Sequence, residues 1–361
     1  MTNNKIKVLV VDDSSVSRVL LVHLLGSDPQ IHVIGAVNDG LAALDFVNGN
    51  SPDVIVMDIH MPHLDGFEAT RRIMETQPVP IIICTATANP KEVVTTFRLM
   101  EAGAVACVEK PVAREHADFE ELVANLLQTV KLMSEVKVVR RWPRLRSTSL
   151  PAPPARPVEL QPAPAAVTLI GIGASTGGPP VLQTILSSLP KDFPVAILIV
   201  QHIARGFLPG LIEWLDQASG LRVHVASHGT CPLPGHAYLA PDDFHMGVTS
   251  GGRILLASEE PENGLRPAVS YLFRSLAEVG GRNSLGVLLS GMGKDGAVEL
   301  KLMKDKGAIT IAQDRESSII HGMPGEAIDL GGATHVLAAD NIAGTLVRLV
   351  NRRHTTGGLE P

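Results

Sequence analysis

The second half of the chain carries a serine, a histidine and an aspartate, each placed shortly after an apolar run. Ser175 follows AVTLIGIG, His202 follows VAILIVQ, and Asp295 follows SLGVLLSGMGK. A serine hydroxyl becomes a nucleophile when a neutral imidazole accepts its proton, and a carboxylate fixes the tautomer of that imidazole and stabilises its charged form. These three residue types predict nucleophilic catalysis if the fold brings them within hydrogen-bond reach.

The turn that carries Ser175, GIGASTGG over residues 171–178, has more than one interpretation. Its first two glycines match part of the dinucleotide-binding pattern G-x-G-x-x-G, but Thr176 stands where the third glycine belongs. The pattern G-x-S-x-G, in which a sharp turn exposes a serine, matches completely from Gly173 to Gly177. Similar turns also occur by chance, where glycines merely let a strand turn sharply into a helix. The turn alone therefore does not decide between these readings.

His202 and Asp295 are favoured over rival residues by their positions after apolar runs. His202 directly follows the strongest buried-strand signal, whereas His224 lies in the alternating segment LRVHVAS, which would point it sideways. Asp242 and Asp243 follow a proline turn and no extended strand. By spacing alone, Asp295 is explained equally well as an N-cap or turn residue. Further rival histidines in this half include His228, His236, His245 and His321.

Met292 stands between Gly291 and Gly293. On composition grounds, a methionine is more often a filler of gaps in the core. Between two glycines, however, its backbone N–H can point into a crevice and stabilise an oxyanion.

The first half of the chain places acidic residues where two apolar runs end. Asp12 and Asp13 follow the first run and Asp58 ends the third, while Thr85 and Lys110 follow the fourth and fifth. Crowded carboxylates need a hard divalent cation such as Mg²⁺ to remain ionised together. A hydroxyl and a fixed positive charge beside them would bind a phosphoryl group. Any one of these residues is explained as surface polarity, but all five together predict a phosphoryl site.

Parallel sheets are the elements that would position both groups of residues. In the first half, five apolar runs alternate with helix-like stretches, at 6–11, 31–37, 53–58, 79–84 and 104–109. This alternation predicts an α/β fold with a doubly wound parallel sheet, and the second half repeats the pattern. Because the carboxyl ends of parallel strands share one edge, residues that follow different strands meet there.

A proline-rich stretch divides the chain. Residues 143–164 contain seven prolines, which cannot sustain a helix or strand, so an extended linker is expected. We predict domains at 1–128 and 167–352, a linker at 129–166 and a flexible tail at 353–361. Four arginines near the linker's start have no interleaved aromatics and are interpreted as solvated.

Composition excludes several classes of protein. The chain has 361 residues, 45% of them hydrophobic and 19% charged, with a net charge of −6, which gives no electrostatic case for nucleic acid or an anionic membrane as the main partner. Neither a secretory signal nor a spanning run of about 18 apolar residues is recognisable. Cys84, Cys107 and Cys231 lack metal-ligand spacing and indicate a cytoplasmic protein.

The first half resembles a two-component response-regulator receiver over roughly residues 5–128. The resemblance is carried by VVDDSSVSR, MDIHMPHLDGFEATRRI, TA at 85–86 and KP at 110–111. It implies a flavodoxin-like fold in which Asp58 accepts a phosphoryl group and Thr85 and Lys110 contact the phosphoryl oxygens. The implied Mg²⁺ ligands are Asp12, Asp13, Asp58 and the backbone carbonyl of His60. Cys107 departs from the aromatic residue usual at its position.

The second half resembles the catalytic domain of chemotaxis protein-glutamate methylesterases of the CheB family. The matching segments are GIGASTGGP, QH at 201–202, PGHAYLAPDD, YLFRSLAE, SGMGKDGA and AQDRESSIIHGMPGEAI. The resemblance implies a Rossmann-like domain in which Ser175 is the nucleophile, His202 the base and Asp295 the orienting acid. It assigns oxyanion stabilisation to the Met292 N–H, aided by Thr176. Departures from the usual family residues are Ile203, His321 and Gly325.

Together the two resemblances imply a phosphorylation-activated serine esterase. It would hydrolyse glutamate methyl esters on methyl-accepting chemoreceptors, and deamidate glutamine by the same route, with no cofactor in the esterase domain. A CheA-type histidine kinase is the expected phosphodonor. The chain order Ser, His, Asp differs from the order of α/β-hydrolases.

Two other function classes stay open at the level of sequence. A receiver joined to a nucleotide-binding oxidoreductase would need an acid about 20 residues beyond the glycine turn, and Gln201 and His202 stand there instead. A receiver joined to a noncatalytic interaction domain would leave Ser175, His202 and Asp295 as polar residues at strand ends.

Overall fold

The computed structural model describes residues 5–85, 97, 99–111, 119–136, 138 and 167–351. The chain forms two compact units, Met1–Leu160 and Gln161–Pro361. Most of the predicted linker and all of the predicted tail lie outside the described residues, so the predicted domain bounds remain predictions.

The first unit contains one five-stranded parallel sheet in the order β2-β1-β3-β4-β5. Its strands are β1 (Ile6–Val11), β2 (Ile31–Val37), β3 (Val54–Met57), β4 (Ile81–Thr85) and β5 (Ala106–Glu109). This confirms the predicted α/β fold. The strand order reverses between β2 and β3 around β1, and a crevice forms at the carboxyl ends of strands where such a reversal occurs. The residues that follow β1 and β3 therefore share this crevice.

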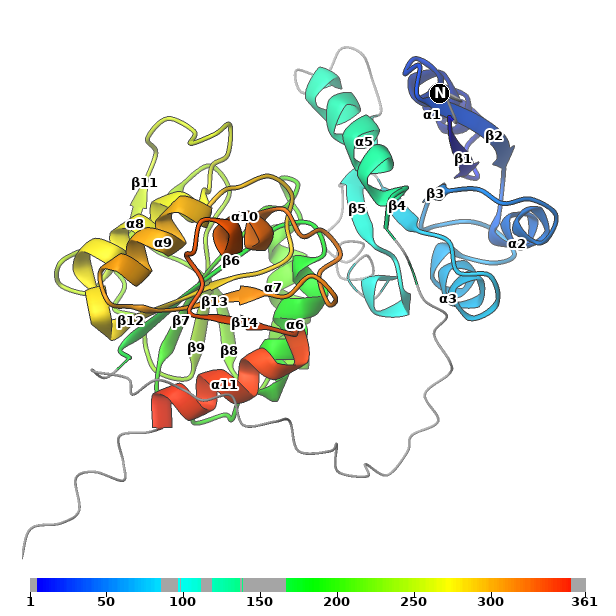
Figure 1. Cartoon of the computed structure of the whole chain (residues 1–361). Coiled ribbons are helices and arrows are strands. Elements are labelled where there is room, and N and C mark those ends of the chain that lie inside the picture. The colour runs from blue at the N-terminus through cyan, green and yellow to red at the C-terminus, as the bar shows by residue number, and fades with distance from the viewer. Residues whose placement is uncertain are drawn as a thin grey trace, which may run out of the picture. The chain divides into compact units, whose positions relative to one another are not determined.

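Helices cover both faces of this sheet. They are α1 (Ser15–Gly26), α2 (Gly40–Gly49), α3 (Gly66–Thr76) and α5 (Phe119–Met133), and Figure 1 shows α2 and α3 on the side opposite α1 and α5. Side chains cap three of these helices. Ser14, Asp39 and Asp65 each accept a hydrogen bond from the backbone N–H three residues later. Each cap satisfies an amide that the helix itself leaves unpaired, and so fixes where the helix begins.

The second unit contains a seven-stranded parallel sheet in the order β14-β13-β12-β6-β7-β9-β8. The strands are β6 (Leu169–Ala174), β7 (Ala196–Gln201), β8 (Arg222–Val225), β9 (His236–Leu239), β12 (Ser284–Leu288), β13 (Ile309–Gln313) and β14 (His335–Leu337). After β6 the chain adds β7, then the edge strand β8, and then β9 between those two, before it returns to add β12, β13 and β14 on the other side of β6. The crevice therefore lies at the carboxyl ends of β6 and β12, with β7 beside them.

Helices also cover both faces of the second sheet (Figure 1). One layer is α6 (Gly178–Ser188), α7 (Leu208–Ala218) and α11 (Ala339–Asn351), and the other is α8 (Val269–Val279), α9 (Ala297–Asp305) and α10 (Met323–Asp329). A two-stranded antiparallel sheet, β10 (His245–Val248) and β11 (Ile254–Ala257), packs against α8. Residues of β7, β10, α8, α9 and β12 share one buried core.

Two glycines of the turn sequence are required for packing. A Cβ on Gly171 would lie 2.4 Å from Leu276 Cδ1, and a Cβ on Gly173 would lie 2.3 Å from Val269 Cγ1. Both neighbours belong to α8, so these glycines let α8 lie directly on β6. Gly177, by contrast, has a φ of 79° and caps α6 in the left-handed conformation that glycine adopts without strain.

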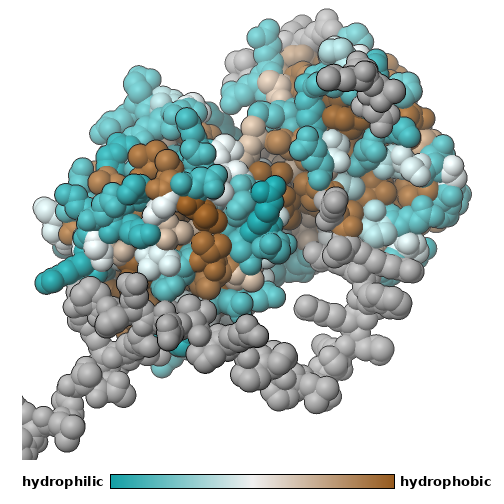
Figure 2. Space-filling model, viewed as in Figure 1, coloured by the Kyte–Doolittle hydropathy of each residue, from teal (hydrophilic) through white to brown (hydrophobic). Residues whose placement is uncertain are grey.

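The surface is mixed in polarity. Figure 2 shows hydrophilic and hydrophobic residues interspersed over the visible face of each unit. Among the described helices, none has both the length and the apolar character needed to cross a membrane.

Candidate active site

His202 and Asp295 contact each other at the carboxyl edge of the second sheet. His202 directly follows β7, and its backbone N–H donates to the carbonyl of Ala174 at the end of β6 (2.9 Å). Its Nε2 lies 3.0 Å from Asp295 Oδ2, close enough for an ion pair but without the angle of a hydrogen bond, and the two side chains are 11% and 3% exposed. An imidazole and a carboxylate from separate loops thus form a nearly water-free pair.

The amino end of α8 holds the Asp295 carboxylate. The Val269 N–H donates to Oδ2 (2.6 Å) and the Ser270 N–H donates to Oδ1 (3.0 Å). Burial acts to raise the pKa of Asp295, but His202 and Ser270 outweigh it, and the pKa lies below its usual value. The positive end of a helix dipole favours the same charged form. Asp295 is therefore ionised at neutral pH and oriented by two backbone N–H groups, with His202 Nε2 beside it.

Sequence reasoning missed this support. Ala268 occupies the N-cap position of α8 and provides no capping side chain. Asp295 caps the helix instead, from 26 residues further along the chain. The alternative reading of Asp295 as a capping residue is thus compatible with a role beside His202, although the capped helix is a distant one. The uncapped start of α8 is a weak signal that a remote acceptor completes it.

Ser175 lies at the end of β6, beside the loop that follows β12. Its N–H donates to the carbonyl of Ser290 (3.0 Å), and the buried Ser290 hydroxyl donates to the carbonyl of Thr176 (2.8 Å). A Cβ on Gly291 would lie 2.8 Å from Ser175 Cβ, so only glycine permits this approach. Ser290, which sequence reasoning also missed, thereby fixes the turn that carries Ser175.

The described contacts do not join the Ser175 hydroxyl to His202 by a hydrogen bond. The two residues are nevertheless neighbours, because Ala174 pairs with Gln201 across adjacent strands and each residue follows one member of that pair. In unliganded sites a nucleophile and its base are often further apart than in the reacting complex.

Met292 lies on a rigid loop beside Ser175. Gly291 donates to the carbonyl of Ile320 (3.0 Å) and accepts hydrogen bonds from the N–H groups of Gly322 and Met323 (3.1 and 2.9 Å). Gly293 has a φ of 76°, and the Met292 side chain is partly exposed. Met292 is therefore not a buried filler of the core.

The rival histidines have other partners. His224 Nε2 and His236 Nδ1 lie 2.8 Å apart, and both rings line a pocket of about 290 Å³ beside the edge strand β8. His245 is fully buried and lies within hydrogen-bond distance of Glu260 O and Ala268 N. His228 lies within hydrogen-bond distance of the backbone O and N of Leu256, and His321 lies within hydrogen-bond distance of the Ser318 hydroxyl.

The rival aspartates support the loop that follows His202. Asp242 accepts a hydrogen bond from the Gly206 N–H (3.1 Å), and Asp243 forms an ion pair with Arg205. Both contacts involve residues three to four positions beyond His202 and leave its ring to Asp295.

The first unit brings its predicted phosphoryl-site residues together. One carboxylate oxygen from each of Asp12, Asp13 and Asp58 lies within 4.8 Å of the others. Lys110 Nζ lies 2.7 Å from Asp58 Oδ2 and 2.8 Å from Asp12 Oδ2. Thr85 is buried at the end of β4, and its carbonyl accepts a hydrogen bond from the Lys110 N–H (2.9 Å). His60 lies in the loop after β3.

The charges of this cluster fit a divalent cation. Burial raises the pKa of Asp12, against the opposing effect of Lys110, and the nearby Asp58 charge adds to the increase. Burial acts to lower the pKa of Lys110, but the two carboxylates outweigh it and the pKa is raised. A single lysine thus balances only part of the negative charge, and three carboxylates are the oxygen ligands that Mg²⁺ prefers.

Cys107 lies on β5 opposite Ile83. Burial raises the pKa of its thiol well above the usual value. Its side chain is partly exposed and packs against the core of the first unit.

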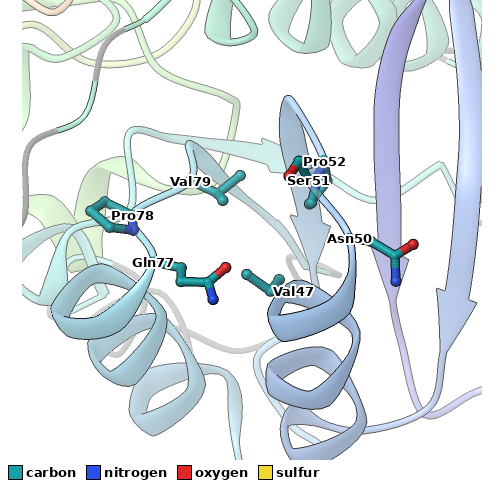
Figure 3. A pocket seen from close by; sticks show the side chains of 7 residues that line it. All are labelled: Val47, Asn50, Ser51, Pro52, Gln77, Pro78 and Val79. Atoms are coloured by element: carbon teal, nitrogen blue, oxygen red, sulfur yellow. The ribbon is translucent and has the colours of Figure 1, made fainter.

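In the first unit, a pocket of about 270 Å³ lies at the amino ends of the strands β3 and β4 (Figure 3). Its lining includes Pro52, just before β3, and Val79, just before β4. Asp58 follows the other end of β3, so this pocket is separate from the predicted phosphoryl site.

Comparisons with known proteins agree with this arrangement. Residues 8–122 match the family model of the response regulator receiver domain, and residues 170–346 match that of the CheB methylesterase. A protein-glutamate methylesterase/protein-glutamine glutaminase of Nitrosospira multiformis is 53% identical over 97% of this chain and 99% of that protein. The chain belongs to the CheB methylesterase family.

Two further CheB relatives support this membership. A protein of the same description from Geobacter metallireducens is 52% identical over 95% of this chain and 99% of its own length. The crystal structure of the Thermotoga maritima CheB methylesterase catalytic domain is 39% identical, with a TM-score of 0.50, and covers 52% of this chain and all of that domain. The predicted CheB-type pair of α/β domains is thus confirmed, whereas the roles of individual site residues remain predictions.

Proposed function

We propose that this chain is a phosphorylation-activated serine esterase that hydrolyses glutamate γ-methyl esters on methyl-accepting chemoreceptors and deamidates glutamine there. The proposal rests chiefly on the 3.0 Å contact between His202 Nε2 and Asp295 Oδ2, at the carboxyl ends of the strands, where Ser175 directly follows the neighbouring strand β6. The names of the relatives supply the substrate class.

The proposed reaction begins with proton transfer to His202. Because Nε2 faces Asp295, Nδ1 is the ring nitrogen that accepts the proton of the Ser175 hydroxyl. The serine oxygen attacks the ester carbonyl, and the Met292 N–H, aided by Thr176, stabilises the oxyanion. Collapse breaks the ester bond, and methanol leaves with the proton held by His202. Water then loses a proton to the same imidazole and attacks the acyl carbonyl, and His202 returns the proton to the serine oxygen as the ester bond to the enzyme breaks and the glutamate carboxyl group is released. Deamidation follows the same route with ammonia leaving.

Asp295 has an electrostatic role in this scheme. Its carboxylate remains ionised throughout and stabilises the imidazolium that forms at each proton transfer. The N–H groups of Val269 and Ser270 keep it in place during this change of charge. No metal or organic cofactor takes part in the proposed esterase steps.

The first unit would regulate this reaction through phosphorylation of Asp58. Asp12, Asp13, Asp58 and the His60 carbonyl would hold Mg²⁺, which when bound neutralises charge on the transferring phosphoryl group. Thr85 and Lys110 would then contact the phosphoryl oxygens. We propose that phosphorylation shifts the chain toward an arrangement in which the receiver leaves the esterase crevice accessible. A CheA-type kinase as phosphodonor and a cytoplasmic location complete the proposal.

Methanol release from methylated receptor tests the function directly. Wild-type protein should release methanol, and Ser175→Ala should reduce the rate to background. Equal rates for the two proteins would contradict the esterase proposal. Tight dinucleotide binding without methanol release would favour an oxidoreductase, and neither activity would favour an interaction domain.

A further inference from the structure

Gln201 joins the two residues between which the proposed reaction moves a proton. It is the last residue of β7, directly before His202, and it pairs across the sheet with Ala174, directly before Ser175. Its side chain is buried, with 6% of the residue exposed. Nothing in the proposed mechanism so far uses it.

The amide nitrogen of Gln201 donates to two backbone carbonyls. Nε2 lies 2.9 Å from Ser175 O and 2.8 Å from His202 O, so both N–H groups of the amide have acceptors. Ser175 O also accepts the Gly178 N–H (2.8 Å). One nitrogen therefore binds the backbone carbonyls of Ser175 and His202, which lie on different loops. Both residues come directly after Ala174 and Gln201, the last paired residues of β6 and β7.

The oxygen of the Gln201 amide is in an unfavourable environment. Gln201 Oε1 is buried and has no hydrogen-bond partner among the described residues. It lies against Gly178, where an added Cβ would approach to 2.4 Å. Reversing the amide would place an oxygen against two carbonyl oxygens, so the orientation is fixed. An unpaired buried acceptor is unfavourable, whereas an apolar side chain would avoid that loss. The two N–H groups are therefore the contribution that only an amide supplies here.

We propose that Gln201 is a positioning residue for the esterase reaction, which ties the backbone of the nucleophile residue to the backbone of the base residue. This inference rests on the proposed function of Ser175 and His202. The two hydrogen bonds of Gln201 keep the distance between the Ser175 turn and the His202 loop constant while charge develops on the imidazole. The described hydrogen bonds of Gln201 join its amide nitrogen to two backbone carbonyls and involve neither the Ser175 hydroxyl nor the His202 ring. Its effect should therefore appear in kcat, since displacements of reacting groups by about 1 Å can cost about 100-fold in rate.

Two substitutions separate the hydrogen bonds from the volume of the side chain. Gln201→Met keeps a similar length and removes both donors. Gln201→Glu keeps the shape and places a carboxylate against two carbonyl oxygens. Thr310→Val is the matched control, because Thr310 is also fully buried and donates to a backbone carbonyl, Gly332 O (2.6 Å), near the amino end of β13. It removes a buried donor far from the carboxyl edge that carries Ser175.

The experiment measures kcat and KM for methanol release from methylated receptor, using full-length phosphorylated protein. The thermal midpoint and the folded fraction by circular dichroism are measured for each variant, and rates are divided by the folded fraction. We expect kcat to fall about 10- to 100-fold in Gln201→Met and further in Gln201→Glu, with KM within about twofold of wild type. Thr310→Val should lower the thermal midpoint and leave kcat within about twofold.

Three results would overturn the positioning role. The first is a Gln201→Met kcat within about twofold of wild type, and the second is a loss confined to KM. The third is an equal fall of kcat in Thr310→Val, because general destabilisation would then explain the effect. If Gln201→Met does not fold, two other variants test the same hydrogen bonds. Gln201→Glu keeps the length of the side chain without the N–H donors, and Gln201→Asn keeps the donors on a side chain that is one methylene shorter. Ser175→Ala distinguishes the two hypotheses, since methanol release by that variant would contradict the proposed function itself.

Discussion

The Asp295 carboxylate serves His202 and α8 at the same time. Its Oδ2 lies 3.0 Å from His202 Nε2 and also accepts the Val269 N–H at 2.6 Å, while Oδ1 accepts the Ser270 N–H at 3.0 Å. The orientation of the imidazole and the start of a core helix are thus coupled through one side chain.

Asp295→Asn should lower kcat by about 10³- to 10⁴-fold with little change in KM, because a neutral amide does not stabilise the imidazolium and favours the wrong imidazole tautomer. The measurement is steady-state methanol release from methylated receptor. Asp305→Asn is the control, since Asp305 is exposed and its side-chain partner among the described residues is Lys301, one helical turn earlier. Similar kcat values for the two variants would contradict the role of Asp295.

The lowered pKa of Asp295 predicts how stability depends on pH. The folded state binds the ionised form preferentially, so the stabilisation is complete above the unfolded pKa of about 4 and is lost as pH falls through the lower folded pKa. The difference in free energy of unfolding between wild type and Asp295→Asn should therefore be constant above about pH 5 and shrink below about pH 4. Denaturant unfolding at a series of pH values measures this difference. A difference that grows on acidification would show that the sign is wrong.

Asp58→Asn should abolish stimulation of the esterase by a small-molecule phosphodonor and leave the unstimulated rate unchanged. An amide does not accept a phosphoryl group, and it weakens the contacts to Lys110 and to Mg²⁺. Asp53→Asn is the matched control, because Asp53 precedes the same strand at its amino end and accepts only the Lys7 N–H in the described contacts. Full stimulation of Asp58→Asn would refute gating through this residue.

Gly173→Ala should destabilise the second unit by about 1–3 kcal/mol and reduce activity. The added methyl would overlap Val269, whose N–H holds Asp295, so packing and catalysis should fail together. Urea unfolding and methanol release measure the two effects. Gly26→Ala is the control, since nothing lies within 4 Å of a Cβ there, and it should be neutral or stabilising by up to about 1 kcal/mol. Unchanged stability of Gly173→Ala would contradict the packing role of this glycine.

The sequence predicted the parallel sheets because their signals are local. Each apolar run is bounded by polar or turn residues, and the five predicted strands of the first unit correspond to β1 to β5, with ends shifted by at most two residues. The positions of residues that follow such runs are also predictable, because the carboxyl ends of all strands in a parallel sheet lie on the same side. Asp12, Asp58 and Lys110 illustrate this, because their types and positions after β1, β3 and β5 predicted the cluster that the structure contains.

The support of Asp295 was not predictable in the same way. The partners that hold it are backbone amides of α8, and a backbone amide has no residue type that a pattern can detect. The same holds for the carbonyls that bind Gln201, and for the closeness of Gly173 to Val269, which depends on how a helix lies on a sheet. Such contacts depend on the distance between elements, and that distance is set by the packing of the whole core.

By itself, the order of residue types along the chain determined that two α/β units are present, that acids and a lysine gather in the first, and that Ser175, His202 and Asp295 follow strands of the second. Only the tertiary structure decided that Nε2 of His202 faces Asp295, that α8 and Gln201 hold the surrounding backbone, and that His224 and His236 contact each other instead. The physical reason is that apolar periodicity is written in neighbouring residues, whereas the direction of a side chain and the partners of a buried polar atom depend on strands and helices that pack together from distant parts of the chain.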